Sequence, residues 1–357
     1  MTSDRSALPW RGRKIAIANA TRTQLRLMAS QREALILDLD APIATLYSAC
    51  SLARELGVPV WGWVEVARDP RAVSKHPEWM HLPQHHEWLE AFPNWSGDYK
   101  ALVSPWVCVN NRETFAYMTE KVRRLVDSAP TLAGLFLNDI QGAPVGCGCG
   151  NVLCRSWDNS PGEKIAPTPY QNPEVFFSKV FWEACIEALD SEDYTRENVI
   201  PILCGECEIG VTIAGVESPD STLGTCRGIP CSRPCAQVYW PNMVRAFAET
   251  QGGGRWKGIL TPYKLFGRDV PLYGETAAWV GGSVAHYREF DNDANLIAVV
   301  QGWDVQAEEI GSQIDQATAN GAKGILILEE PLDQSWEPVP VPNDYKATIP
   351  PIMCGHD

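Results

Sequence analysis

Short apolar segments rich in β-branched residues recur along the chain and are separated by longer amphipathic stretches. Within each short segment the apolar residues are continuous, which is typical of strands that are buried on both faces of a sheet. Eight segments of this kind are found, at residues 15–20, 34–40, 58–66, 132–139, 199–206, 258–263, 296–304 and 324–330. They predict the strands of a parallel sheet.

The stretches between these segments carry helical periodicity together with start and stop signals. Helices are predicted over residues 43–56, 113–126, 174–189 and 305–320; Asn172 and Pro173 open the third, and Gly57 and Gly321 follow the first and the last. Strands that alternate with helices in this way predict the α/β class and a closed (β/α)8 TIM barrel. A doubly wound open sheet is the alternative fold.

The spacing of the segments also predicts the domain organisation. A single barrel is expected over residues 1–335, followed by a Pro-rich tail over residues 336–357. The connection after the third strand, residues 67–107, is rich in His and Trp and is interpreted as a lid or specificity loop. The loops at 141–160 and 204–241, the second of which follows the fifth strand, are rich in cysteine.

Composition narrows the partners that the protein can have. Hydrophobic residues make up 45% of the chain, which is enough for a large core, and the formal net charge is −14. Such a charge repels nucleic acids and acidic membranes, so a small-molecule partner is expected, with a homo-oligomer as a possibility. No amino-terminal signal-like run or membrane-length apolar stretch is present in the sequence, which favours a cytoplasmic protein.

The predicted strands end in polar residues, most of them acidic. These residues are Asp38, Asp40, Glu65, Asn138, Asp139, Glu206, Tyr263, Asp304, Glu329 and Glu330. The carboxyl ends of barrel strands share one mouth, where barrel enzymes place their active sites. Gathering so many carboxylates costs several kcal/mol unless they are paired or used on a ligand. A ligand site is therefore predicted at this mouth, although any single acid could be a helix cap or an ion-pair partner.

Carboxylates beside indole rings favour carbohydrate chemistry at the mouth. Glycoside hydrolysis requires two carboxyl groups that flank one bond. Trp61 and Trp63 alternate along one strand with Glu65, so the two rings and the carboxylate should face the same side. Either ring could equally be core. The predicted substrate-binding residues are Asp40, Trp61, Trp63, Glu65, Asn138, Tyr263 and Trp303.

A Gly-rich loop holds three cysteines within eight residues: Cys147, Cys149 and Cys154. The chain has twelve cysteines and no secretion signal, so thiols and metal ligands are expected rather than disulfides. Zinc prefers four ligands in a tetrahedron, and Cys108 is the predicted fourth ligand. A second group, Cys204, Cys207, Cys226, Cys231 and Cys235, could hold another metal, form disulfides or consist of plain loop thiols.

One arrangement of residues resembles the zinc-binding region of family 42 β-galactosidases and related (β/α)8 glycosidase-like proteins. It consists of Cys108, the strand that ends in Asn138-Asp139, and the cysteine loop. The resemblance covers about fifty residues and implies a structural zinc. It also implies that Asp139 is the general acid and that Asn138 contacts a sugar hydroxyl. The family has Glu at the position of Asp139. Asp304 or Glu206 would then attack the anomeric carbon or activate water, with Glu330 as a further candidate.

Two other functions are compatible with the same residues. A lyase or isomerase acting on a sugar acid would use a strand-end carboxylate to remove a proton next to a carbonyl, with a divalent metal held by the acids. A carbohydrate-binding barrel without catalysis would keep the indole rings and lack turnover.

Overall fold

The strands of the protein form a ring in the computed structural model, which describes residues 8–79, 107–108, 111–138, 140, 173–204, 225–226, 229–230, 256–260, 280–281, 284–285, 288, 295–303 and 305–330. The ring is made of β1 (Trp10–Lys14), β2 (Ala34–Asp38), β3 (Val60–Glu65), β4 (Gly134–Asn138), β5 (Val199–Cys204), β8 (Trp256–Leu260), β9 (Asn295–Gln301) and β10 (Gly324–Leu328). A short antiparallel pair, β6 (Thr225–Cys226) and β7 (Ile229–Pro230), is separate from it.

Neighbouring strands of the ring are all parallel. Each strand pairs with the next ring strand along the chain, and β1 pairs with β10 as well as with β2, so the sheet is a closed barrel. The parallel α/β architecture expected from the sequence is confirmed.

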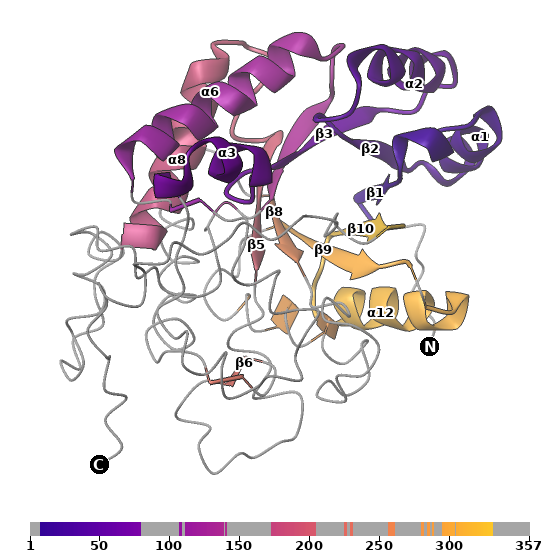
Figure 1. Cartoon of the computed structure of the whole chain (residues 1–357). Coiled ribbons are helices and arrows are strands. Elements are labelled where there is room, and N and C mark those ends of the chain that lie inside the picture. The colour runs from indigo at the N-terminus through magenta and orange to yellow at the C-terminus, as the bar shows by residue number, and fades with distance from the viewer. Residues whose placement is uncertain are drawn as a thin grey trace, which may run out of the picture.

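Helices pack on the outside of the sheet (Figure 1). They are α1 (Arg22–Gln31), α2 (Ile43–Glu55), α6 (Arg112–Ser128), α8 (Pro173–Leu189) and α12 (Ala307–Ala319). The short α3 (Pro70–Lys75) and the 3-10 turns η2 (Ile17–Asn19) and η3 (Pro77–Trp79) belong to the connections between strands and helices. The first helix packs on β2, the second on β3 and the last on β9, while α6 lies beside α8. No helix among the described residues has the length and apolarity needed to cross a membrane.

The first predicted strand is wrong. Residues 15–20 were expected to form it, whereas β1 is Trp10–Lys14 and Ile17–Asn19 is a 3-10 turn. The reason is that β1 is a charged strand whose arginines are paired. Glu33 is 1% exposed and accepts hydrogen bonds from Arg11 and Arg13, and Arg13 also pairs with Glu329. A strand with charged residues can be buried when those charges are paired, and a search for apolar segments does not find such a strand.

The helix α1 was also not predicted. Only Leu25 and Met28 of this helix are buried, so its apolar stripe is narrow. Its ends are nevertheless well defined: the side chain of Thr21 accepts a hydrogen bond from the Gln24 N–H, and Arg32 ends the helix with a left-handed backbone at φ 56°. Capping rather than apolar periodicity marks this helix in the sequence.

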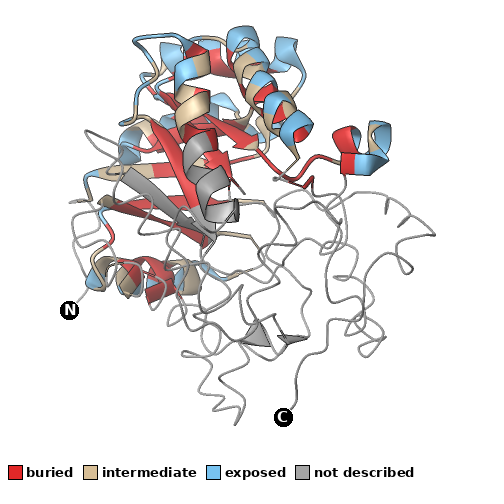
Figure 2. Cartoon of the chain, turned by 90° about the vertical axis from the view of Figure 1, so that its left-hand side faces the viewer, coloured by how far each residue is buried: buried red, intermediate tan, exposed pale blue. Residues whose placement is uncertain are grey.

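The barrel interior is filled by alternate residues of the strands. Buried apolar side chains include Ile36, Trp63, Phe136, Ile202, Val299 and Leu328, and a second cluster fills the space between strands and helices. Figure 2 shows this as buried strands surrounded by helices that are exposed on one side. In the described strands, polar side chains that face the barrel interior therefore lie at the strand ends.

Candidate functional site

Polar side chains continue the inward-facing positions of the strands at their carboxyl ends. Lys14, Asp38, Glu65 and Asn138 are the last residues of β1, β2, β3 and β4, and Glu330 follows β10 by two positions. Because side chains alternate along a strand, these five residues belong to the face that forms the barrel interior. We refer to Lys14, Asp38, Glu65, Asn138 and Glu330 as the mouth cluster.

Lys14 is the cation of the mouth cluster and is 2% exposed. Its Nζ lies 2.7 Å from Oδ2 of Asp38 and 3.6 Å from Oε1 of Glu330, and 5.5 Å from the centroid of the Trp63 ring. Sequence reasoning missed Lys14 because it placed the first strand after this residue. The signal was present, however, since Trp10, Gly12 and Lys14 alternate with two arginines.

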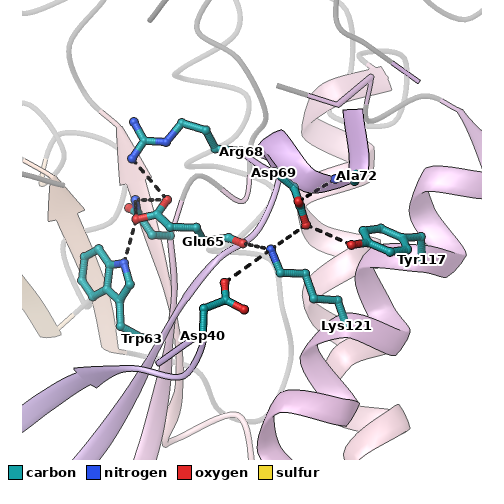
Figure 3. A network of polar contacts seen from close by, with 9 residues as sticks. Asp40, Trp63, Glu65, Arg68, Asp69, Ala72, Tyr117 and Lys121 are labelled. Carbon is teal, nitrogen blue, oxygen red and sulfur yellow. Dashed lines mark hydrogen bonds and ion pairs between the residues drawn. The ribbon is translucent and has the colours of Figure 1, made fainter. Parts of the chain in front are cut away.

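Donors converge on the carboxylate of Glu65. Trp63 Nε1 donates to Oε1 at 2.8 Å, and Asn138 Nδ2 lies 3.1 and 3.0 Å from Oε1 and Oε2. Arg68 Nη2 is 3.6 Å from Oε2 (Figure 3). The carboxylate is thus held in one orientation by neutral and charged donors. Asn138 is fully buried, and among the described residues no donor reaches its Oδ1.

Asp38 differs from Glu65 in its electrostatic surroundings. The Asp38 side chain is 43% exposed, yet desolvation of its carboxyl group within the mouth raises its pKa, and the negative charges of Glu65 and Asp40 add to the rise. Lys14 opposes the rise through its charge and its hydrogen bond but does not cancel it. The mouth cluster therefore contains one carboxyl group that binds its proton more tightly than an ordinary Asp.

A second polar network lies where β3 meets α6. Lys121 Nζ is 2.9 Å from the backbone oxygen of Glu65, 2.9 Å from Oδ2 of Asp69 and 4.0 Å from Oδ2 of Asp40. Tyr117 Oη donates to Asp69 Oδ2 at 3.1 Å. Asp40, expected to bind substrate, has a 49% exposed side chain beside this network.

The remaining predicted site residues fall into three groups. Trp61 lies near the amino-terminal end of β3 and packs on Trp10 and Phe136 in the barrel interior, away from the mouth. Gly134 makes room for it, since a Cβ there would come 2.4 Å from the Trp61 ring. The side chain of Glu329 faces outward from the barrel and pairs with Arg13. Trp303 packs against the apolar cluster in the barrel interior. Asp139, Glu206, Tyr263 and Asp304 lie outside the described residues.

Cys108 is the one described member of the expected zinc set. It is buried, its N–H donates to the carbonyl of Trp79 at 2.7 Å, and Thr114 Oγ1 donates to its carbonyl at 2.6 Å. Cys147, Cys149 and Cys154 lie outside the described residues. Within the part of the chain that the structure describes, no group of three His, Cys, Asp or Glu side chains could hold a metal ion. The zinc site remains a prediction.

The connection 67–107, expected to be a lid, is described only at its two ends. Its start holds α3 and η3, with Asp69 as the amino-terminal cap of α3. The Val107 N–H donates to the carbonyl of Ala67 at 2.8 Å, so the beginning and the end of the connection meet at the end of β3. The two described ends of this connection therefore lie next to the mouth cluster.

No protein-family model and no curated protein sequence matches the chain. Among solved structures it is similar to a chitobiase from Flavobacterium johnsoniae, at 10% identity and a TM-score of 0.44 over 97% of this chain and 47% of that one. It is also similar to a β-N-acetylhexosaminidase, at 12% identity and a TM-score of 0.38 over 90% and 66% of the two chains. It is similar as well to an inactive variant of the exo-β-N-acetylglucosaminidase from Vibrio harveyi, at 8% identity and a TM-score of 0.41 over 90% of this chain and 50% of that one. The chain thus spans about half the length of the first of these proteins.

Proposed function

We propose that the protein is a glycoside hydrolase whose substrate binds at the mouth cluster. The observation that carries the proposal is the pair formed by Asp38 and Glu65. Burial raises the pKa of Asp38, whereas the carboxylate of Glu65 is held by N–H donors from Trp63 and Asn138. The mouth therefore holds neighbouring carboxyl groups whose protonation its surroundings set differently, which is the electrostatic setting that acid and base catalysis at a glycosidic bond needs.

We assign the catalytic roles to residues that the sequence predicts at the same mouth. Asp139, next to Asn138 at the end of β4, is the proposed donor of the proton to the glycosidic oxygen. Asp304 or Glu206 is the proposed group that attacks the anomeric carbon or activates water, and Tyr263 would orient it. Glu330 is a further candidate for that group, and Glu65, Asp40 and Trp303 are proposed to surround the sugar. The buried Oδ1 of Asn138, for which no described residue supplies a donor, supports a contact with a sugar hydroxyl.

A structural zinc held by Cys108, Cys147, Cys149 and Cys154 is part of the proposal. Four thiolates are a donor set that suits tetrahedral zinc. The backbone contacts of Cys108 with Trp79 and Thr114 place this cysteine just before α6, where a bound metal would hold the start of that helix. We assign the zinc no part in hydrolysis.

Turnover of a panel of aryl glycosides and oligosaccharides tests the proposal, with reducing-sugar release as the readout. Asp139→Asn is expected to lower kcat/KM by about 10²-fold or more, the usual contribution of a positioned acid. Glu65→Gln, which removes a charged contact with the sugar, is expected to lower it by about tenfold or more. Asp127→Asn is the matched control, because this aspartate lies exposed on α6 and pairs with Arg123. An Asp139→Asn variant within about tenfold of wild type would contradict its role. Ligand binding without turnover of any substrate would instead indicate a binding protein.

Lys14 favours a second candidate, a lyase or isomerase that acts on a sugar acid. A buried ammonium next to carboxylates could stabilise an enolate oxygen while one carboxylate removes the neighbouring proton. Incubating the protein with sugar acids in D₂O and following loss of the α-proton by NMR distinguishes the two reactions. Proton exchange that stops on chelation, together with an absence of glycoside turnover, would favour this candidate.

A further inference from the structure

Lys121 is a buried cation that the proposed hydrolysis does not use. It lies on α6 and is 5% exposed. Its ammonium group reaches oxygens from three segments: the end of β3 at Glu65, the cap of α3 at Asp69, and Asp40 after β2 (Figure 3). A lysine is rarely buried unless its charge is paired, so this arrangement requires an explanation.

The contact with Glu65 compensates for the difference in strand length. The last contact between β2 and β3 is the hydrogen bond from the Leu39 N–H to the Trp63 carbonyl. Because β2 ends at Asp38 and β3 ends at Glu65, the last two residues of β3 have no strand beside them on the β2 side. The next carbonyl on this edge belongs to Glu65. Lys121 Nζ, 2.9 Å away, donates to it in place of a strand N–H. The backbone that carries the Glu65 side chain is therefore held from the helix layer.

Asp69 fixes the ammonium in turn. Its Oδ1 accepts from the Ala72 N–H at 2.9 Å and its Oδ2 from Tyr117 Oη at 3.1 Å, so the carboxylate has defined partners on both oxygens. Burial alone would raise the pKa of Asp69, but the charge of Lys121 and these hydrogen bonds outweigh it and lower the pKa. Lys121 and Asp69 thus form a stable ion pair behind Glu65.

We propose that Lys121 is a positioning residue for Glu65, which rests on the proposed function of the mouth cluster. Lys121 acts through the main chain. Its ammonium holds the carbonyl of Glu65 on the helix side, while Trp63 and Asn138 hold the carboxylate of the same residue in the barrel. Glu65 is then fixed at both ends, and loss of Lys121 lets the carboxylate leave the orientation in which it meets the sugar.

A double-mutant cycle separates positioning from general stability. Lys121→Met is expected to lower kcat/KM by about tenfold, and the Lys121→Met/Glu65→Gln double variant should be no worse than Glu65→Gln, since both changes remove the same interaction. Lys121→Arg, which retains N–H donors, should recover part of the loss. Arg123→Met, an exposed change on the same helix, is the control. Losses that multiply in the double variant would overturn the proposal.

A second readout does not depend on hydrolysis. The indole N–H of Trp63 donates to Glu65, so its ¹H–¹⁵N resonance, assigned with Trp63→Phe, reports the position of that carboxylate. It should shift in Lys121→Met and in Lys121→Met/Asp69→Asn, which avoids an unpaired buried charge if the single variant fails to fold. An unshifted resonance in the folded double variant would overturn the role of Lys121. Lack of activity on every glycoside, with the shift present, would overturn the proposed function alone.

Discussion

Two aspartates near the mouth differ in the direction in which the fold shifts their pKa values. Asp69 has a cation and two hydrogen-bond donors, so its pKa is lowered in spite of burial. Asp38 has Lys14, but burial and the negative charges of Glu65 and Asp40 prevail, so its pKa is raised. The same residue type thus serves as a fixed anion at one position and as a proton-holding group at the other.

Asp69→Asn should destabilise the protein by about 3 kcal/mol at pH 7, because it leaves Lys121 buried without its closest anion. The folded-state pKa of Asp69 is lowered, so its contribution to stability is present above the unfolded value of about 3.9 and is lost as pH falls through the folded value. The difference from wild type in urea unfolding free energy should therefore shrink below about pH 4. A difference independent of pH would contradict this ion pair.

Asp38→Asn should show the opposite pH dependence. The folded-state pKa of Asp38 is raised, so the folded wild type binds a proton more tightly than the unfolded chain. Its stability relative to the Asn variant is then greatest below about pH 4 and declines as pH rises from there through the folded value. Urea unfolding at several pH values checks the slope. A wild-type advantage that grows with pH would mean that Lys14 dominates over burial.

At the scale of elements, β1 is the strand whose formation depends most on charge pairing. Arg11 and Arg13 point away from the barrel interior, and both donate to Glu33, which precedes β2. Arg13 also pairs with Glu329, just after β10. The strand is thereby linked to both of its neighbours in the ring by ion pairs as well as by backbone hydrogen bonds.

Glu33→Ala should lower the free energy of unfolding by about 3 to 5 kcal/mol, because it removes the buried partner of two guanidinium groups. Glu55→Ala provides the matched control. Glu55 pairs with Arg22 through side chains that are 57% and 46% exposed, so its loss should lower the free energy of unfolding far less than the loss of Glu33. Denaturant unfolding of the two variants gives the comparison. Equal effects would show that the Glu33 ion pairs do not stabilise β1.

At the scale of the whole molecule, the cysteine cluster is proposed to hold the start of α6 next to the barrel. Metal analysis of the purified protein should find one zinc per chain if Cys108 and the loop cysteines form the site, and Cys108→Ser should lower that content. Cys50→Ser is the control, because burial raises the pKa of the Cys50 thiol to about 11 and disfavours a metal-binding thiolate. Two zinc ions per chain would point to a second site, and none would refute the cluster.

Seven of the eight predicted strands overlap strands of the ring, because continuous apolar segments are a local property that a linear pattern reveals. The acids at the ends of β2, β3 and β10 could be predicted for the same reason, since alternation fixes which strand-end residues face the interior. The sequence by itself therefore determined the parallel α/β class and the presence of Asp38, Glu65 and Glu330 at one mouth.

Only the tertiary structure decided which charges meet. The position of β1 depends on Glu33 reaching two arginines about twenty residues earlier, and without that position Lys14 could not be recognised as part of the mouth. Lys121 lies 56 residues from Glu65 and bonds its backbone, a contact that leaves no mark on periodicity. Trp61 and Trp63 share a face, yet Trp61 is only partly buried near the amino-terminal end of the barrel, whereas Trp63 is 1% exposed and supports Glu65. The surroundings of each ring depend on the register of β3 with its neighbours.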